Sequence, residues 1–141
     1  MIRFANKYDN DKIIELLKDF AIKSNNPLTN NPLAWSKTYI EQILATLYAG
    51  RGFVLIDNDQ TDILVAAKTE CFWLKDIYQL QEVMLTGNNK FVIYKLIREY
   101  IKIAKEMLLK KEINQAVMSS YDDLKFERYG MVKLEQHWEI K

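Results

Sequence analysis

The residues best suited to chemistry lie in an apolar segment at positions 78–85, Tyr-Gln-Leu-Gln-Glu-Val-Met-Leu. Strict alternation along a strand would put Glu82 on one face with Leu80 and Met84. A carboxyl group partly withdrawn from water in this way has its pKa raised toward the range useful for proton transfer. The alternative is an exposed Glu82 opposite a lysine.

A turn, Gly87-Asn88-Asn89-Lys90, follows this segment and leads into a long helical pattern. The apolar side of the pattern comprises Val92, Leu96, Ile97, Tyr100, Ile101 and Ala104. Helix N-termini carry free N–H groups and partial positive charge, so this junction could hold a phosphate group, with Lys90 as an added charge. The alternative is that the turn only connects a strand to a helix.

Composition predicts one cytoplasmic domain over residues 1–141. The chain is 49% hydrophobic, and its 20 Lys and Arg nearly balance its 19 Asp and Glu, which gives no indication of nucleic-acid binding. The single cysteine, Cys71, excludes an intramolecular disulfide and a cysteine-based metal cluster, and we expect no metal site. No apolar run is long enough to span a membrane, so we expect a soluble protein.

Strand and helix patterns alternate along the chain. Period-2 or short apolar runs predict strands at 1–5, 53–56, 63–67, 78–85, 116–118, 131–134 and 137–140. Helical spacing predicts a helix capped by Asp9, Asn10 or Asp11, a second from Ser36 to Gly50, the long helix after Gly87, and a short one at 121–129. The longest loop is expected at 24–32, which contains Asn-Asn-Pro twice.

This order of elements is similar to that of the GNAT acyltransferase superfamily. The run Phe126-Glu127-Arg128-Tyr129-Gly130-Met131 resembles the family's Tyr-x-x-x-Gly-Phe motif, and Ile2-Arg3-Phe4-Ala5 resembles its usual start. The resemblance implies an α+β (α/β) fold, with a mixed, mostly antiparallel sheet of six to seven strands flanked by about four helices. A narrower likeness, over 85–100, 114–118 and 125–126, is to a GNAT-like internal virion protein of short-tailed phages.

The resemblance also implies a reaction, the transfer of an acetyl or other acyl group from acetyl-CoA to an amine. The acceptor would be a small molecule, a protein N-terminus or a lysine. Glu82 would be the base, with Glu70 as a second candidate, because a protonated amine cannot attack a thioester. The residues implied to contact the cofactor are Val83, Met84, Leu85, Gly87, Asn88, Asn89 and Lys90.

Two departures from the family pattern leave a second function open. Asn88, Phe91 and Ile93 stand where the family has an Arg and two glycines that close on the pyrophosphate. Phe126 stands where many members have a tyrosine acid, for which Tyr121 or Tyr129 could substitute. The alternative function is therefore a GNAT-fold protein without catalysis that serves in binding or assembly, for example in a virion.

Aromatic residues also gather at 71–78, Cys-Phe-Trp-Leu-Lys-Asp-Ile-Tyr. This cluster could form a substrate lip or a contact surface for another protein, and a homodimer is one such assembly. The alternative is that its rings cover the open face of the sheet. His137 is the only histidine, and we do not expect it to be catalytic.

Overall fold

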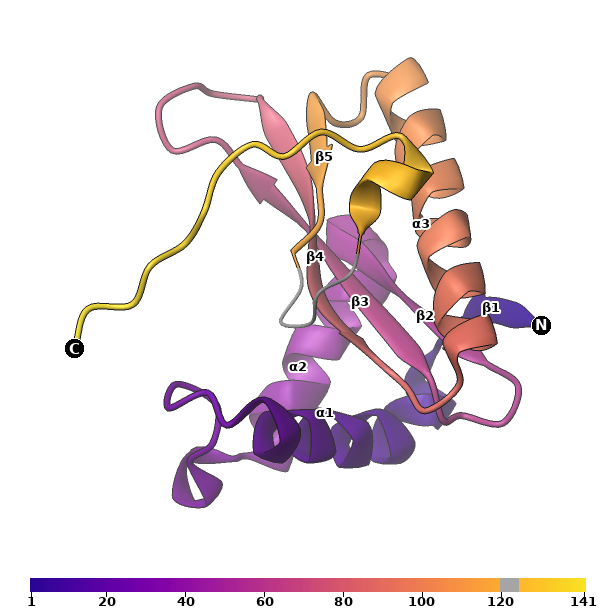
Figure 1. Cartoon of the computed structure of the whole chain (residues 1–141). Helices are drawn as coiled ribbons and strands as arrows, with labels where there is room; N and C mark the ends of the chain where they lie inside the picture. The colour runs from indigo at the N-terminus through magenta and orange to yellow at the C-terminus, as the bar shows by residue number, and fades with distance from the viewer. Residues whose placement is uncertain (120–124) are drawn as a thin grey trace.

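The computed structural model describes residues 1–119 and 125–141 and contains one five-stranded sheet in the order β1-β2-β3-β4-β5 (Figure 1). The strands are β1 (Ile2–Phe4), β2 (Gly52–Asp57), β3 (Ile63–Glu70), β4 (Tyr78–Thr86) and β5 (Gln115–Val117). The first four pair in antiparallel fashion, and β5 joins β4 in parallel. This mixed, mostly antiparallel α+β arrangement confirms the predicted fold class.

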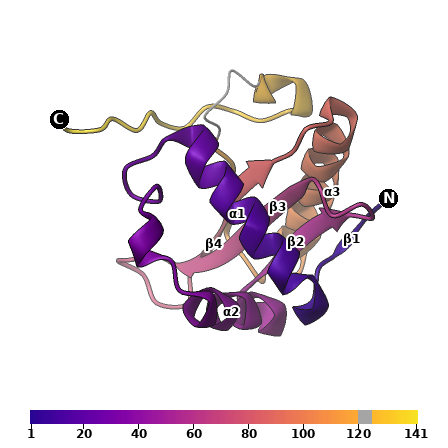
Figure 2. The ribbon, with the colours of Figure 1, turned by 90° about the horizontal axis from the view of Figure 1, so that it is seen from below.

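In the described part of the chain, three α-helices cover the two faces of the sheet: α1 (Asn10–Ser24), α2 (Lys37–Thr46) and α3 (Lys90–Leu109). α1 and α2 lie on one face and α3 on the other (Figures 1 and 2). Alternation along β2 serves both layers, because Val54 and Ile56 pack with Ile13 of α1, whereas Phe53 and Leu55 pack on the α3 side. The sheet is therefore buried on both faces.

Local side-chain caps fix where the helices begin. The Ser36 hydroxyl accepts the Tyr39 N–H at 3.2 Å, which confirms the predicted start of α2. A single π-helical turn, Leu47–Arg51, follows α2, and the helical conformation ends within it at Gly50, whose φ of 112° suits glycine. α1 has Asp9 at its N-cap position, one of the three predicted residues, but the Asp9 side chain makes no cap hydrogen bond there. Asn6 instead caps a short 3₁₀ turn, Lys7–Asp9, that runs directly into the helix.

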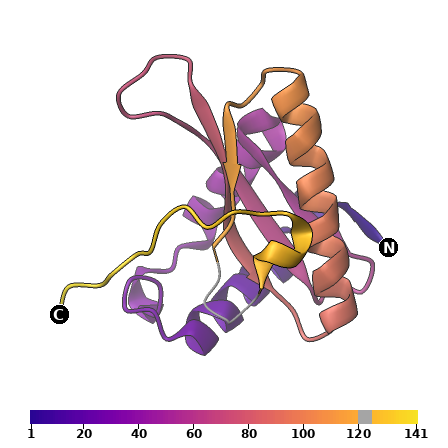
Figure 3. The same ribbon diagram turned by 45° about the horizontal axis from the view of Figure 1, so that its top comes forward.

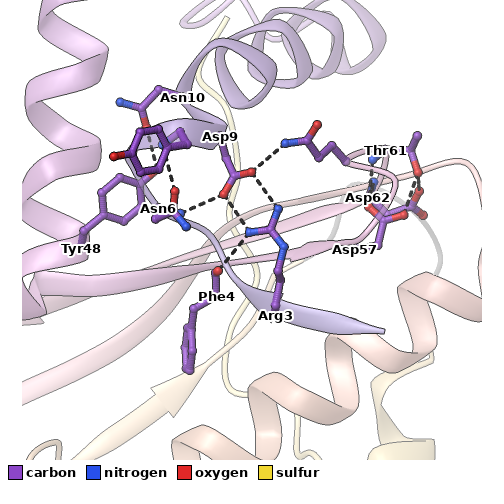
Figure 4. Close-up of polar contacts among 11 residues, drawn as sticks. Arg3, Phe4, Asn6, Asp9, Asn10, Tyr48, Asp57, Thr61 and Asp62 are labelled. Carbon is purple, nitrogen blue, oxygen red and sulfur yellow. Dashed lines mark hydrogen bonds and ion pairs between the residues drawn. The ribbon is translucent and has the colours of Figure 1, made fainter.

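The Asp9 carboxylate accepts the Asn6 N–H at 3.0 Å in a capping box and also ties three segments together. It accepts hydrogen bonds from the Arg3 guanidinium at 2.8 and 2.9 Å and from the Gln60 amide at 2.7 Å (Figure 4). The hydrogen bonds from Arg3 hold the pKa of Asp9 well below its usual range, although burial opposes them. β1, the start of α1 and the β2–β3 turn are thereby linked.

β4 contains one more residue than the part of β3 that it pairs with. Val65 pairs with Met84 and Ala66 with Glu82, so Val83 between them has no opposite residue and forms a β-bulge. The prediction of strict alternation is therefore wrong for Met84. Leu80 and Glu82 face α3, whereas Met84 packs on the side of α1 and α2.

The predicted strands at 131–134 and 137–140 are wrong, because the structure has no strand in residues 125–141. From the helix predicted at 121–129, the described part forms a 3₁₀ turn, Phe126–Tyr129. The chain then passes β5 and runs away from the rest of the molecule (Figure 3). Period-2 alternation marked these residues as able to form strands, but it could not supply them with a partner within the chain.

Candidate functional site

The pairing between β4 and β5 ends beside Glu82. Their pairing covers Gln79 with Gln115, Leu80 with Ala116 and Gln81 with Val117, and it extends no further among the described residues. The next residue of β4 is Glu82, which immediately precedes the bulge at Val83. The pairing of the two strands therefore ends at an acidic side chain.

Glu82 is almost fully buried, with 3% of its surface exposed. One carboxylate oxygen accepts the N–H of Ser119, at 3.3 Å, from the segment that follows β5. Burial raises the pKa of Glu82 to about 7, and the Ser119 hydrogen bond only partly offsets this effect. Near neutral pH both forms of the carboxyl group are populated, which suits a group that accepts and releases protons.

Tyr100 of α3 bridges the two strands at their last paired positions. Its hydroxyl donates to the Val117 carbonyl at 2.7 Å and lies 3.3 Å from the Leu80 carbonyl oxygen. Burial and, to a smaller extent, the charge of Glu82 raise the pKa of this hydroxyl. Sequence reasoning placed Tyr100 in the core and missed its role here, although a buried tyrosine hydroxyl generally needs a polar partner. Tyr100 positions the end of β5 relative to Glu82.

At the start of α3, a carboxylate from another part of the chain lies beneath the Gly87 turn. Asp62, 1% exposed, accepts the Asn89 N–H at 3.2 Å. A Cβ atom added to Gly87 would collide with this carboxylate, so the glycine is needed for close approach. The Asn89 side chain in turn accepts the N–H of Phe91 at 2.9 Å. Asp62 and Asn89 thus occupy donors that an external anion would otherwise use.

The Asp62 carboxylate is held in place by the β2–β3 turn (Figure 4). The Thr61 hydroxyl lies 2.8 Å from one Asp62 oxygen and 2.9 Å from one Asp57 oxygen. Burial alone would raise the pKa of Asp57, but N–H groups of Asp62 and Thr61 outweigh it and lower that pKa. Two buried carboxylates therefore lie near the α3 N-terminus, a feature that the sequence analysis did not predict.

Positive charge is also present at this turn. The Lys23 ammonium group donates to the Asn88 side chain at 3.3 Å, and Lys90 is the first residue of α3. Within residues 1–119 and 125–141, the N–H groups of Asn88, Lys90 and Val92 have no acceptor. The turn thus keeps donors and cations for a phosphate group, with the Asp62 charge opposing them.

Solved structures share this architecture over the whole chain. One is a predicted acetyltransferase with acetyl-CoA from Clostridium acetobutylicum, with a TM-score of 0.73 and 12% identity over 100% of this chain and 95% of that one. A GNAT family acetyltransferase from Staphylococcus aureus gives 0.62 and 14%, covering 100% and 97%. The chain has the GNAT fold.

Glucosamine-6-phosphate N-acetyltransferase from Arabidopsis thaliana is a further GNAT-like neighbour, with a TM-score of 0.66 and 12% identity over 100% of this chain and 97% of that one. No protein-family model and no curated protein sequence matches the chain. At these identities the likeness concerns the fold, so the reaction has to be argued from the residues.

Within this GNAT fold, the other predicted site residues lie at different places and do not all gather around Glu82. Val83 is exposed on the bulge, Met84 is in the core, and Leu85 is half-buried on the α3 side. Tyr129 packs its ring against Tyr94 of α3, with the centroids 5.9 Å apart. No hydrogen bond joins Tyr129 to Glu82, and Tyr121 lies outside the described residues.

The second candidate base and the aromatic cluster lie at the tip of the β3–β4 connection. Glu70 accepts the Asp76 N–H at 3.2 Å and is exposed, so it lacks the desolvation found at Glu82. Phe72 and Trp73 contact each other edge to face, with centroids 4.8 Å apart, and both are more than four-fifths exposed. These rings do not cover the sheet, which excludes the alternative raised for them above.

The described residues offer neither a metal-binding cluster nor a membrane-spanning helix. Neither stretch of described chain brings three His, Cys, Asp or Glu side chains together as a metal site would require. No helix there combines the length and apolar character needed to cross a bilayer.

Proposed function

We propose that this protein transfers an acetyl group from acetyl-CoA to an amine, with Glu82 as the general base. The observation that carries the proposal is the position of Glu82, buried beside the point where β4 and β5 separate, with a pKa of about 7. An aliphatic amine is mostly protonated at neutral pH and must lose a proton before it can attack an acyl group. A carboxylate with this pKa can accept that proton, directly or through a water molecule.

The residues available to hold acetyl-CoA fall into two groups. The backbone of Val83 and Leu85 lies past the last β4–β5 pair, where an extended ligand could lie along β4. At the turn, free N–H groups of Asn88 and Lys90, with the ammonium groups of Lys23 and Lys90, would face the phosphates. Gly87 and Asn89 would shape this turn, and Met84 would support it from the core. When bound, acetyl-CoA supplies an acyl group activated as a thioester.

Other residues of the protein would position Glu82 and deliver the proton to the leaving thiolate. The Ser119 N–H stabilises the ionised form of Glu82, and Tyr100 keeps the end of β5 at a fixed place beside it. Tyr121 and Tyr129 remain our proposed proton donors in place of the tyrosine that Phe126 replaces. The acceptor is an amine on a small molecule, a protein N-terminus or a lysine side chain.

A second function, binding or assembly without catalysis, is favoured by a different observation. The Asp62 carboxylate already takes an N–H at the α3 N-terminus and adds negative charge where a pyrophosphate would lie. A GNAT-fold component of a larger assembly, such as a virion, would need no cofactor there. The exposed Phe72 and Trp73 would then be buried against a partner.

Binding of acetyl-CoA distinguishes the two functions. Ligand at about 100 times its Kd stabilises the folded state by about 2.7 kcal/mol, which raises the Tm by several degrees and is confirmed by calorimetric titration. Release of the CoA thiol is then followed with a panel of primary amines. We expect Glu82→Gln to bind acetyl-CoA as wild type does and to lose turnover. Full activity of Glu82→Gln would remove its proposed role, and no binding at millimolar acetyl-CoA would favour the second function.

A further inference from the structure

The C-terminal residues 132–141 alternate between an apolar and a polar face. The apolar positions are Val132, Leu134, Trp138 and Ile140. The charged or titratable positions between them are Lys133, Glu135, His137, Glu139 and Lys141. Only Gln136 interrupts the apolar face. This is the period-2 pattern of a strand with one buried side.

These apolar side chains are exposed to solvent. Val132, Trp138 and Ile140 are 82%, 84% and 96% exposed, and Figure 3 shows the segment extending past β5 into open space. The contact between Glu135 and His137, at 3.7 Å, and the ion pair Glu139–Lys141, at 3.2 Å, each join residues two positions apart. Side chains two positions apart share one face only in an extended chain. The segment is therefore extended, but no strand pairs with it among the described residues.

The order of the charges identifies the partner. When two copies of the segment run antiparallel with Gln136 opposite Gln136, the facing pairs within residues 132–140 are complementary. Lys133 then faces Glu139, and the Glu135 carboxylate faces the His137 imidazole, which can donate a hydrogen bond to it. On the other face, Leu134 lies opposite Trp138, and Val132 lies opposite Ile140.

Neighbouring registers lose this complementarity. Sliding one strand by two residues keeps apolar side chains on one face, but it places Glu135 opposite Glu135 or opposite Glu139, depending on direction. Like charges directly opposite each other destabilise a strand pair. A slide by one residue mixes the two faces. The charges therefore specify the register centred on Gln136.

We propose that residues 131–141 of two copies of this chain pair as antiparallel strands about a two-fold axis and form a homodimer. Such a contact is isologous, because Lys133 of each copy faces Glu139 of the other. Pairing also covers one edge of each strand and brings the exposed apolar faces of both copies onto one side of a ribbon. The contact is smaller than a standard interface, so we expect dissociation in roughly the micromolar range.

The proposal is tested with the full-length chain by reversing one charge of the Lys133–Glu139 pair and then reversing both. Sedimentation equilibrium from about 1 to 200 μM gives the dimer Kd for wild type, Lys133→Glu, Glu139→Lys and the double variant. Each single variant creates two like-charge contacts per dimer and should weaken dimerisation about tenfold. The double variant restores both contacts in reversed order and should dimerise as wild type does. Lys141→Glu, which faces Met131 in this register, is the matched control and should change the Kd little.

Each possible result supports or overturns the proposal. Weakening by both single variants together with recovery in the double variant supports it. A wild-type protein that stays monomeric to 200 μM overturns it, and would place the segment on its own β5 or on a different protein. A dimer that tolerates Lys133→Glu unchanged also overturns it, because the copies would then meet elsewhere.

Discussion

A carboxylate oxygen of Asp62 lies 3.2 Å from the backbone nitrogen of Asn89, at the first turn of α3. The two residues are far apart in the sequence, and the β2–β3 turn brings Asp62 beneath the Gly87 turn. The protein thus places its own anion at the helix end where a phosphate-containing ligand would bind. Whether acetyl-CoA binds depends on the balance between this charge and the ammonium groups of Lys23 and Lys90.

Removing the Asp62 charge should strengthen acetyl-CoA binding. In Asp62→Asn the side chain keeps its size and can still accept the Asn89 N–H, while its repulsion of the pyrophosphate disappears. We expect a Kd several-fold lower by calorimetric titration at low ionic strength, with the difference shrinking as salt is added. Asp59→Asn, at an exposed position of the same turn, is the control and should leave the Kd nearly unchanged. An equal or weaker affinity in Asp62→Asn would show that the ligand does not contact this turn.

Glu82→Gln should stabilise the fold at alkaline pH while it removes activity. The pKa of Glu82 is about 7 in the folded state and near 4.5 when unfolded, so the folded state holds an extra proton between these values and stability falls as pH rises through them. Above pH 7 the ionised side chain costs up to about 3 kcal/mol, which Gln avoids. Urea unfolding at pH 5 and pH 8 measures this effect. A stability difference between variant and wild type that is the same at both pH values would contradict the raised pKa.

Tyr100→Phe should loosen the end of β5. The substitution keeps the ring but leaves the Val117 carbonyl without its 2.7 Å hydrogen bond, at a cost of about 1–3 kcal/mol in unfolding free energy. Turnover should fall as well, because Ser119 would no longer be held beside Glu82. Tyr94→Phe removes a hydroxyl from a half-exposed ring of the same helix and should change stability by less than about 0.5 kcal/mol. Equal effects of the two substitutions would mean that the Tyr100 hydroxyl positions nothing.

Gly87→Ala should destabilise the protein through Asp62. The added methyl group would collide with the buried carboxylate, and overpacking of this kind costs about 1–3 kcal/mol. In an Asp62→Ala background the same substitution should cost much less, which chemical denaturation of the four proteins in the cycle would measure. Asn88→Ala is a control at the next position, since it loses only the exposed contact with Lys23. An unchanged cost of Gly87→Ala in the Asp62→Ala background would mean that the glycine is needed for another reason.

The sequence predicted the helices and strands better than it predicted the contacts between them. Helical spacing with caps predicted a helix from Ser36 to Gly50, where α2 and the π-helical turn after it lie, and turn chemistry predicted the β2–β3 hairpin, because these signals are local. Of the two interpretations given for Glu82, the buried one holds and the exposed one is wrong. The Ser119 hydrogen bond, the bridge made by Tyr100 and the carboxylate of Asp62 beneath Gly87 all join distant segments. No local pattern encodes them.

Two errors have the same physical origin. Alternation in β4 predicted a shared face for Glu82 and Met84, but pairing with β3 introduced a bulge at Val83 and turned Met84 over. Alternation predicted strands at 131–134 and 137–140, but residues 125–141 contain none, because no strand of the described chain pairs with them. In both cases periodicity described the strand itself, whereas the outcome depended on the neighbouring strand.

The bulge at Val83 can be treated as a removable unit. Because Val83 alone lacks an opposite residue, its deletion would leave Leu80, Glu82, Met84 and Leu85 on the faces that they now occupy. β4 is therefore equivalent to a regular strand with one additional residue, which lies directly after the acidic residue. Shortening β4 by this one position would straighten the strand beside Glu82 and leave both layers of the core with the same residues.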